Sequence, residues 1–317
     1  MRVLVTGGAG FIGSNVVKLL REESYDVAVL DSFITGYREN LMNLSGVELI
    51  EGDIRDQAVV ERAVGDVDAI VHMAASVGNV KSLEDPILDS EVNVLGTLRV
   101  LDAARKAGVK KVVYSSSAAL YGEPKYIPIT EEHPLSPETP YGVSKLAGEK
   151  HCLCYGDLYG MDIISLRYFN VYGPNQRYDA YGNVVPIFVS SLLYDESLTI
   201  YDDGEQTRDF VNVRDVAVAN LLAIKSKGVK GVFNIGSGEV TTVNQLAATI
   251  KVESGMEMSL NYCPPRQGDV RDSLSDISKA RNTLGYHPSV TLKSGIKSYV
   301  RWLMSEEHTA PSAGANA

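Results

Sequence analysis

Hydrophobic residues in the first half of the chain occur in short runs that are separated by longer amphipathic segments. The runs predict six strands, at residues 2–6, 27–30, 47–51, 68–72, 111–115 and 163–167. The segments between them predict helices, at residues 11–22, 56–63, 89–107 and 141–160. Regular alternation of strand and helix predicts an α/β fold, a doubly wound parallel Rossmann sheet with helices on both faces.

The pattern changes after Asn170, where Gly, Pro and Asp pairs interrupt shorter elements. We therefore predict a division into a dinucleotide-binding domain, a smaller mixed α/β C-terminal substrate domain and a flexible tail. The predicted boundaries are residues 1–169 for the first domain, which the chain rejoins near 210–235, residues 170–209 and 236–304 for the second, and residues 305–317 for the tail.

A glycine-rich turn, Thr6-Gly7-Gly8-Ala9-Gly10-Phe11-Ile12-Gly13, follows the first predicted strand. It fits GxGxxG from Gly8 and GxxGxxG from Gly7. Such a turn lets backbone N–H groups approach a pyrophosphate at the helix N-terminus. Asp31 ends the second strand about 20 residues further on, where a carboxylate binds both ribose hydroxyls and repels a 2′-phosphate. The sequence therefore predicts NAD rather than NADP, and a structural turn with an unrelated Asp is the alternative.

Tyr141 and Lys145 lie one turn apart in a predicted helix that Pro140 begins. A nearby ammonium favours phenolate, so we expect the pKa of the tyrosine to fall towards the working pH. Such a group can take a proton from a secondary alcohol. The spacing alone is weak, because 17 tyrosines in 317 residues give about one such pair by chance. A second pair, Tyr121-Gly122-Glu123-Pro124-Lys125, cannot be helical.

Three serines, Ser115, Ser116 and Ser117, lie at the end of the strand predicted at 111–115. The carboxyl ends of parallel strands are where such folds bind ligands. A serine hydroxyl there can bind the reacting oxygen and orient its proton. A serine-rich turn without a ligand is the alternative.

The composition is that of a globular protein, with 44% hydrophobic and 22% charged residues. The net charge of −10 argues against a nucleic-acid surface. Because the first strand begins at residue 2 and no apolar stretch spans a bilayer, we expect a cytoplasmic protein with no membrane partner. The cysteines, Cys152, Cys154 and Cys263, lack metal-ligand spacing, so we expect free thiols and no metal.

Taken together, the chain resembles the extended short-chain dehydrogenase/reductases, and within them the UDP-sugar 4-epimerases, over about residues 1–304. The matching pieces are the glycine turn, Asp53-Ile54, His72-Met73-Ala74-Ala75, Ser115-Ser116-Ser117, Tyr141 with Lys145, Arg167-Tyr168-Phe169-Asn170, Thr207-Arg208-Asp209-Phe210 and Arg266-Gln267-Gly268-Asp269. In this family a homodimer is usual, and the resemblance implies one here, through the helices at 89–107 and 141–160.

The resemblance implies NAD as the cofactor and assigns residues to it. At the pyrophosphate they are Gly7, Gly10, Phe11, Ile12 and Gly13. At the adenosine ribose they are Asp31, Ser32, Thr35 and Gly36, and at the adenine Asp53 and Ile54. Along the remainder of the cofactor they are Met73, Ala74, Ala75, Asn93, Ser115, Tyr141, Lys145 and Phe169. Among the last group, Asn93 and Phe169 would lie towards the nicotinamide, and Lys145 would bind its ribose.

The resemblance also implies a UDP-sugar substrate. Tyr141 would be the base, and Ser117 would hold the sugar 4-hydroxyl. The nucleotide part would be bound by Asn170, Thr199, Tyr201, Arg208, Arg266 and Asp269. The small residue Ser273 would leave room around the sugar, so that N-acetylated hexoses are accepted beside the plain ones.

The implied reaction is the interconversion of UDP-glucose and UDP-galactose through a transient 4-keto sugar, extended to the N-acetylhexosamine pair. A 4,6-dehydratase is one alternative, but such enzymes usually carry an Asp-Glu pair where this chain has Ala118 and Ala119. A UDP-glucuronate decarboxylase is another. A catalytically silent dinucleotide-binding protein is the alternative from a different functional class.

Overall fold

A seven-stranded sheet, parallel throughout, forms the centre of the computed structural model, which describes residues 1–178, 183–194, 196–265 and 270–307. The strand order is β11-β6-β5-β4-β1-β2-β3. The strands are β1 (Arg2–Thr6), β2 (Asp26–Asp31), β3 (Val47–Glu51), β4 (Ala69–His72), β5 (Lys111–Ser117), β6 (Asp162–Tyr168) and β11 (Gly231–Ile235). The order reverses between β1 and β4, where doubly wound folds bind their ligands. The predicted α/β fold is confirmed.

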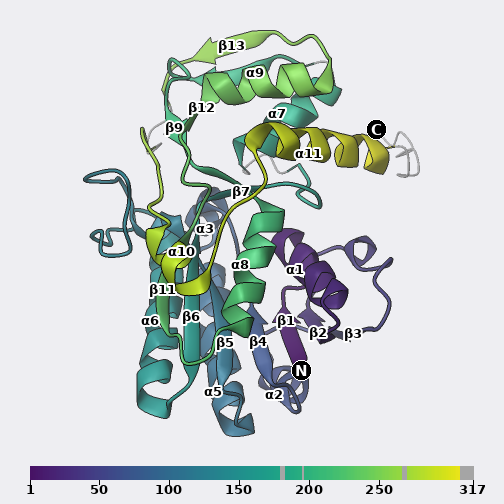
Figure 1. Ribbon diagram of the computed structural model, residues 1–317, viewed down its shortest axis with the longest axis vertical. Helices are drawn as coiled ribbons and strands as arrows, with labels where there is room; N and C mark the ends of the chain where they lie inside the picture. The colour runs from purple at the N-terminus through teal and green to yellow at the C-terminus, as the bar shows by residue number, and fades with distance from the viewer. Residues whose placement is uncertain (179–182, 195, 266–269, 308–317) are drawn as a thin grey trace.

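Helices cover both faces of the sheet because successive strand residues point to opposite sides (Figure 1). Val3 and Val5 of β1 pack in one hydrophobic cluster, and Leu4 packs in another. The first cluster takes in α1 (Phe11–Glu22), α8 (Val213–Lys225) and α10 (Ser278–Leu284). The second takes in α2 (Gln57–Val64), α5 (Thr97–Ala107) and α6 (Pro140–Tyr159).

The helix predicted at 89–107 differs from the expectation in its centre. The Asp85 side chain caps α4 (Pro86–Ser90), which leads into a π-helical stretch, η2 (Glu91–Gly96), and then into α5. Within η2, the buried Asn93 turns its amide towards other elements, and its carbonyl accepts the Thr97 hydroxyl at 2.7 Å. Single π turns of this kind are frequent at functional sites.

A second group of elements lies beyond the carboxyl ends of the strands, at the top of Figure 1. Its members are α7 (Val184–Leu193), α9 (Val243–Ser254), α11 (Leu292–Glu307), β8 (Leu198–Tyr201) and β13 (Leu260–Cys263). The three helices and β8 share a third hydrophobic cluster, which includes Phe188, Leu246 and Tyr299, and β13 pairs with β8. The predicted domain boundaries themselves stay a prediction.

Short elements connect these two groups. They are the pairs β7 (Asn170–Tyr172) with β10 (Phe210–Asn212) and β9 (Thr207–Arg208) with β12 (Thr241–Thr242). Three further short elements lie in the loops of the first group: η1 (Arg38–Asn40), α3 (Asn79–Glu84) and η3 (Ala118–Leu120). In the described part of the chain, no helix combines the length and the apolar character needed to cross a membrane.

Asp209 holds together two segments that run between the central sheet and the C-terminal group. Its buried carboxylate accepts hydrogen bonds from the backbone N–H of Ser237 at 2.6 Å, Gly238 at 3.1 Å and Ser275 at 3.1 Å. Gly236 leaves room for this carboxylate, because a Cβ there would lie 2.5 Å from its Oδ2. One side chain therefore joins the loop after β11 to the segment that precedes α10.

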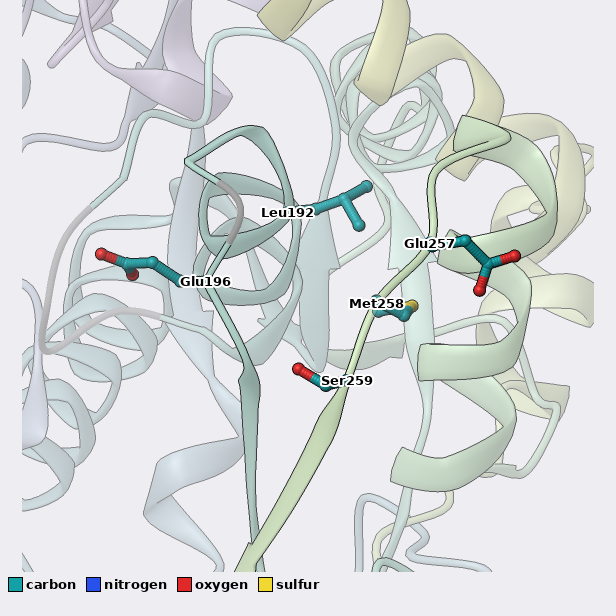
Figure 2. A pocket seen from close by; sticks show the side chains of 5 residues that line it. All are labelled: Leu192, Glu196, Glu257, Met258 and Ser259. Carbon is teal, nitrogen blue, oxygen red and sulfur yellow. The ribbon is translucent and has the colours of Figure 1, made fainter.

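An open hollow of about 310 Å³ lies in the C-terminal group, between the end of α7 and the start of β13 (Figure 2). Its lining residues are Leu192, Glu196, Glu257, Met258 and Ser259. None of them belongs to the central sheet or to α6, so this hollow is separate from the strand ends where the fold places its ligand.

A buried ion pair fastens α6 to the sheet. The Glu149 carboxylate receives two hydrogen bonds from Arg167 of β6, at 2.6 and 3.0 Å, and one from Ser116 of β5, at 2.8 Å. Arg167 also donates to the Tyr121 phenol at 2.8 Å. Burial disfavours the guanidinium charge, but Glu149 outweighs this and raises the pKa of Arg167 above its ordinary value.

We predict that Glu149→Gln lowers the free energy of unfolding by about 3–5 kcal/mol, because it leaves the Arg167 charge buried without its partner. Urea unfolding followed by circular dichroism measures this loss. The matched control is Glu23→Gln, whose carboxylate pairs with Lys225 at 2.6 Å on the surface. Here the expected loss is below about 1 kcal/mol. Equal losses in the two variants would contradict the structural role given to Glu149.

Candidate active site

The glycine turn brings β1 close to β4 at the point where the strand order reverses. Gly7 has a φ of +70°, and a Cβ on it would lie 2.7 Å from the Ala74 nitrogen. A Cβ on Gly13 would lie 2.1 Å from the Gly7 oxygen. Side chains at these two positions are therefore excluded. At Gly10, by contrast, a Cβ would meet one atom within 4 Å, the Gly7 oxygen at 3.3 Å, so the chain there faces open space.

The N-terminus of α1 is suited to an anion. Gly10 is its N-cap and supplies no side-chain cap, so the N–H groups of Phe11, Ile12 and Gly13 have no partner inside the helix. These donors and the helix dipole fit the pyrophosphate of a dinucleotide. The open space in front of Gly10 lets a phosphate approach the backbone closely.

Asp31 links the turn to the loop after β2. Its Oδ2 accepts a hydrogen bond from the Ala9 nitrogen at 2.8 Å, and its Oδ1 accepts one from the Phe33 nitrogen at 2.9 Å. Each carboxylate oxygen keeps a second lone pair, so the group can also accept ribose hydroxyls. Gly36 stands against this carboxylate, since a Cβ there would lie 2.7 Å from Oδ1. Ser32 and Thr35 of the same loop are exposed.

A buried chain of hydroxyl groups and an imidazole supports the glycine turn, and no motif in the sequence predicted it. His72 Nδ1 lies 2.7 Å from the Thr6 hydroxyl, and Nε2 lies 3.0 Å from that of Thr97. Thr97 donates to the Asn93 carbonyl, so Nε2 carries the proton and Nδ1 accepts from Thr6. Thr6 in turn accepts from the Met73 and Ala74 nitrogens. Burial lowers the pKa of His72 to about 3, which keeps the ring neutral.

Tyr141 and Ser117 meet where β5 ends and α6 begins. The Thr139 hydroxyl caps α6 by accepting from the Gly142 nitrogen at 3.2 Å, which places Tyr141 in the first turn. Burial raises the pKa of Tyr141 to about 12, although hydrogen bonding with Ser117 partly opposes it. The expected fall in this pKa is therefore wrong for the protein alone, because desolvation of the phenolate outweighs any nearby cation.

Lys145 lies one turn further along α6 and is buried. Its Nζ lies 4.6 Å from the centre of the Tyr114 ring, over the aromatic face. Burial lowers the pKa of Lys145 to about 8, against the opposing influence of Cys152, Asp89 and Glu149. The ammonium is thus held in the interior beside β4 and β5.

Successive serines of β5 point to opposite faces of the sheet, so Ser116 points away from the side of Ser115 and Ser117. The Ser115 hydroxyl lies 3.2 Å from that of Tyr168, and Ser116 donates to Glu149 at 2.8 Å. Ser117 faces the Tyr141 phenol and accepts a hydrogen bond from the Ala119 nitrogen at 3.1 Å. The strand extends to Ser117, two residues beyond the prediction, so the three serines lie in a strand and not in a turn. Their contact with a ligand stays a prediction.

The remaining predicted site residues are spread over both parts of the molecule. Asp53 pairs with Arg55 at 2.8 Å, Asn170 begins β7, and Thr199 and Tyr201 lie in β8. Ile54, Phe169 and Ser273 are buried, and the Arg208 guanidinium bonds the Thr207 carbonyl at 2.7 Å. Arg266 and Asp269 lie outside the described residues. The assignments of individual residues to cofactor or substrate stay predictions.

Among the described residues, no group of three His, Cys, Asp or Glu side chains is arranged to hold a metal ion. The fold and the site define a dinucleotide-binding α/β enzyme with a Ser, a Tyr and a Lys at the carboxyl edge of a Rossmann sheet. The chain belongs to the NAD dependent epimerase/dehydratase family, whose sequence profile matches residues 3–236.

Known proteins of similar sequence and structure cover nearly the whole chain. UDP-glucose 4-epimerase from Mycolicibacterium smegmatis is 39% identical over 311 residues, which are 96% of this chain and 99% of that protein. The crystal structure of UDP-glucose 4-epimerase with UDP-glucose from Thermotoga maritima has a TM-score of 0.92 and 40% identity over 97% of this chain and all of that one.

A third relative acts on a different sugar nucleotide. It is UDP-N-acetylglucosamine 4-epimerase from Methanobrevibacter ruminantium, solved in complex with UDP-N-acetylmuramic acid. Its TM-score is 0.92, with 35% identity over 96% of this chain and 98% of that one. The family membership that the sequence motifs predicted is confirmed.

We predict that Gly13→Ala prevents NAD binding and lowers the melting temperature, because its methyl group would collide with the Gly7 carbonyl. Release of NAD from denatured protein, measured by absorbance and mass spectrometry, gives the bound fraction. The matched control is Gly65→Ala at the end of α2, where the nearest atom would be 3.5 Å from the new Cβ. Full NAD content in the Gly13 variant would show that the turn tolerates a side chain.

Proposed function

We propose that this protein is an NAD-dependent UDP-hexose 4-epimerase that interconverts UDP-glucose and UDP-galactose through a 4-keto intermediate. The observation that carries the proposal is the meeting of Ser117 and Tyr141 beside a dinucleotide turn, in a chain so similar to UDP-glucose 4-epimerases. The intact Ser, Tyr and Lys set argues against a silent binding protein.

NAD, when bound, supplies a reversible acceptor and donor of hydride and a positive charge on its oxidised ring. Ser117 holds the sugar 4-hydroxyl by a hydrogen bond, and Tyr141 removes the proton of that hydroxyl. The positive charges of Lys145 and of the ring favour the phenolate and so oppose the effect of burial on Tyr141. After the 4-keto sugar has turned to present its other face, the Tyr141 phenol returns the proton to the oxygen.

The 4,6-dehydratase alternative lacks its acid and base. Elimination of the 6-hydroxyl needs a proton donor for that group and a base at C5. Ala118 and Ala119 stand directly after Ser117 in η3, and their methyl groups provide neither. The residues after Ser117 therefore favour an epimerase over a 4,6-dehydratase.

We also propose that two copies associate through adjoining helices, in the cytoplasm. Apolar side chains are exposed on α4, η2 and α6, where Ile87 is 70%, Leu95 48% and Val143 53% exposed. These elements pack beside one another within the chain, so the side chains lie on neighbouring helices. The three free cysteines fit a reducing compartment.

We predict that the purified protein converts UDP-glucose into UDP-galactose without added NAD, and that Tyr141→Phe lowers kcat by about 10³-fold or more while NAD stays bound. The phenylalanine keeps the ring but removes the group that takes the proton. Chromatography of the sugar nucleotides measures conversion. Tyr126→Phe, at an exposed loop tyrosine, is the matched control and should retain full activity.

Three outcomes would contradict this function. Loss of water from the sugar would identify a dehydratase, and release of CO₂ from UDP-glucuronate without 4-epimerisation would identify a decarboxylase. No change in any sugar nucleotide, with NAD bound, would support the silent binding protein.

We predict that both plain and N-acetylated UDP-hexoses are turned over, and that Ser273→Tyr suppresses the N-acetylated pair selectively. Ser273 is small and buried beside Leu274, whose carbonyl accepts the Ile129 N–H at 2.7 Å. A tyrosine there would fill the space that an N-acetyl group needs. The ratio of kcat/KM for the two substrates should change by about 10-fold or more. Ser278→Tyr on the exposed start of α10 is the control. Equal losses for both substrates in Ser273→Tyr would refute a role of Ser273 in substrate selection.

A further inference from the structure

A buried carboxylate that the mechanism does not use lies beside the Tyr141–Lys145 pair. Asp89 in α4 is 1% exposed, and its Oδ1 accepts a hydrogen bond from the Asn93 amide at 2.9 Å. In the described part of the chain its Oδ2 has no hydrogen-bond partner. Burying a carboxylate in this way is costly, so such a group calls for a nearby positive charge or a specific role.

Asp89 is connected to the catalytic turn by a chain of hydrogen bonds. The Asn93 amide that Asp89 holds also donates to the Ser144 hydroxyl at 3.1 Å. Ser144 donates to the Tyr141 carbonyl, again at 3.1 Å. Asn93 also receives the Ser76 N–H at 2.9 Å. The π turn that carries Asn93 therefore joins α4, the loop after β4 and the first turn of α6.

The charge of Asp89 also acts on both catalytic groups. It raises the pKa of Tyr141, after the larger effect of burial, and it opposes the lowering of the Lys145 pKa by burial. Burial raises the pKa of Asp89, and Ser144, the Lys145 charge and the Asn93 amide oppose this, in that order. The buried carboxylate and the buried ammonium thus each oppose part of the effect that burial has on the pKa of the other.

Other groups face this pair from the elements packed around it. They are Ser117 and Tyr114 on β5, His72 on β4, and Glu149 and Cys152 on α6. His72 is kept neutral by burial, and Glu149 forms an ion pair with Arg167. Among the described residues, Asp89 is the charged group that acts on both Tyr141 and Lys145.

We propose that Asp89 is a positioning residue for the Tyr141–Lys145 pair: it orients Asn93 and the first turn of α6, and its charge sets the pH range in which the pair works. The proposal rests on the proposed epimerase function for its kinetic test. Loss of the negative charge favours phenolate at Tyr141 and neutral amine at Lys145, so both ionisations move to lower pH.

The first experiment is the pH profile of kcat/KM with UDP-glucose for the NAD-bound protein and three variants. Asp89→Asn keeps an oxygen that can accept from Asn93 but loses the charge. Both the acidic and the basic limb of the pH profile should therefore move to lower pH, by about half a unit or more. Asp89→Ala loses the hydrogen bond as well, and should show the same shift and a kcat about 10-fold lower.

The third variant, Asp102→Asn, is the matched control. It removes the same charge from α5, where Asp102 pairs with Arg105 and Lys106 on the surface, and its profile should match that of the unaltered protein. A role confined to stability would lower the activity of the Asp89 variants without moving either limb. Unmoved limbs in Asp89→Asn would therefore overturn the proposal.

A second measurement does not depend on turnover. Tyrosine labelled with ¹³C at the phenol carbon reports the ionisation of Tyr141 by NMR, with Tyr141→Phe identifying its signal in NAD-bound protein. In Asp89→Asn this signal should titrate at lower pH than in the unaltered protein, and in Asp102→Asn at the same pH. If the protein epimerises nothing, the proposed function fails, whereas an unchanged Tyr141 titration in Asp89→Asn overturns the role of Asp89.

Discussion

The buried pair of Glu149 and Arg167 is the interaction on which the arrangement of the site depends. α6 carries Tyr141 and Lys145, and Glu149 ties this helix to β6 through Arg167 and to β5 through Ser116. β5 also brings Ser117 to the same edge of the sheet. Because both charges are buried and hydrogen-bonded, separating them would cost several kcal/mol. The pair therefore holds α6 in one position against the sheet. The distance between the Tyr141 and Ser117 hydroxyls follows from that position of the helix.

A second constraint acts at the other end of the dinucleotide site. The close approach of Gly7 and Gly13 is possible because neither has a side chain, and Thr6 closes the gap to β4 through its bonds to Met73 and Ala74. His72 continues this chain to Thr97 and so to Asn93. One path of hydrogen bonds, through Thr6, His72 and Thr97, therefore joins the glycine turn to the π turn of η2.

The sequence predicted those features that depend on local pattern. Periodicity located the strands of the central sheet, and the spacing of Gly7, Gly13 and Asp31 indicated a dinucleotide-binding turn after the first of them. It failed where tertiary contacts matter: at the π turn, the Asn93 side chain bonds Ser76 and Ser144, which lie in other elements. The pKa of Tyr141 likewise depends on burial, which spacing cannot reveal. Arg167 and Asp209 appeared only as parts of motifs, and their buried partners come from segments far away in the sequence.

The raised pKa of Tyr141 suits a reaction that must run in both directions. An epimerase base has to take a proton and return it to the same oxygen within one turnover, so a permanently ionised phenolate would be a poor acid in the second half. Burial makes the neutral phenol the resting form, and charges that gather around it during the reaction favour the phenolate for part of the cycle. In the proposed mechanism, the opposition between desolvation and local charge, rather than a fixed low pKa, would let Tyr141 serve as base and as acid.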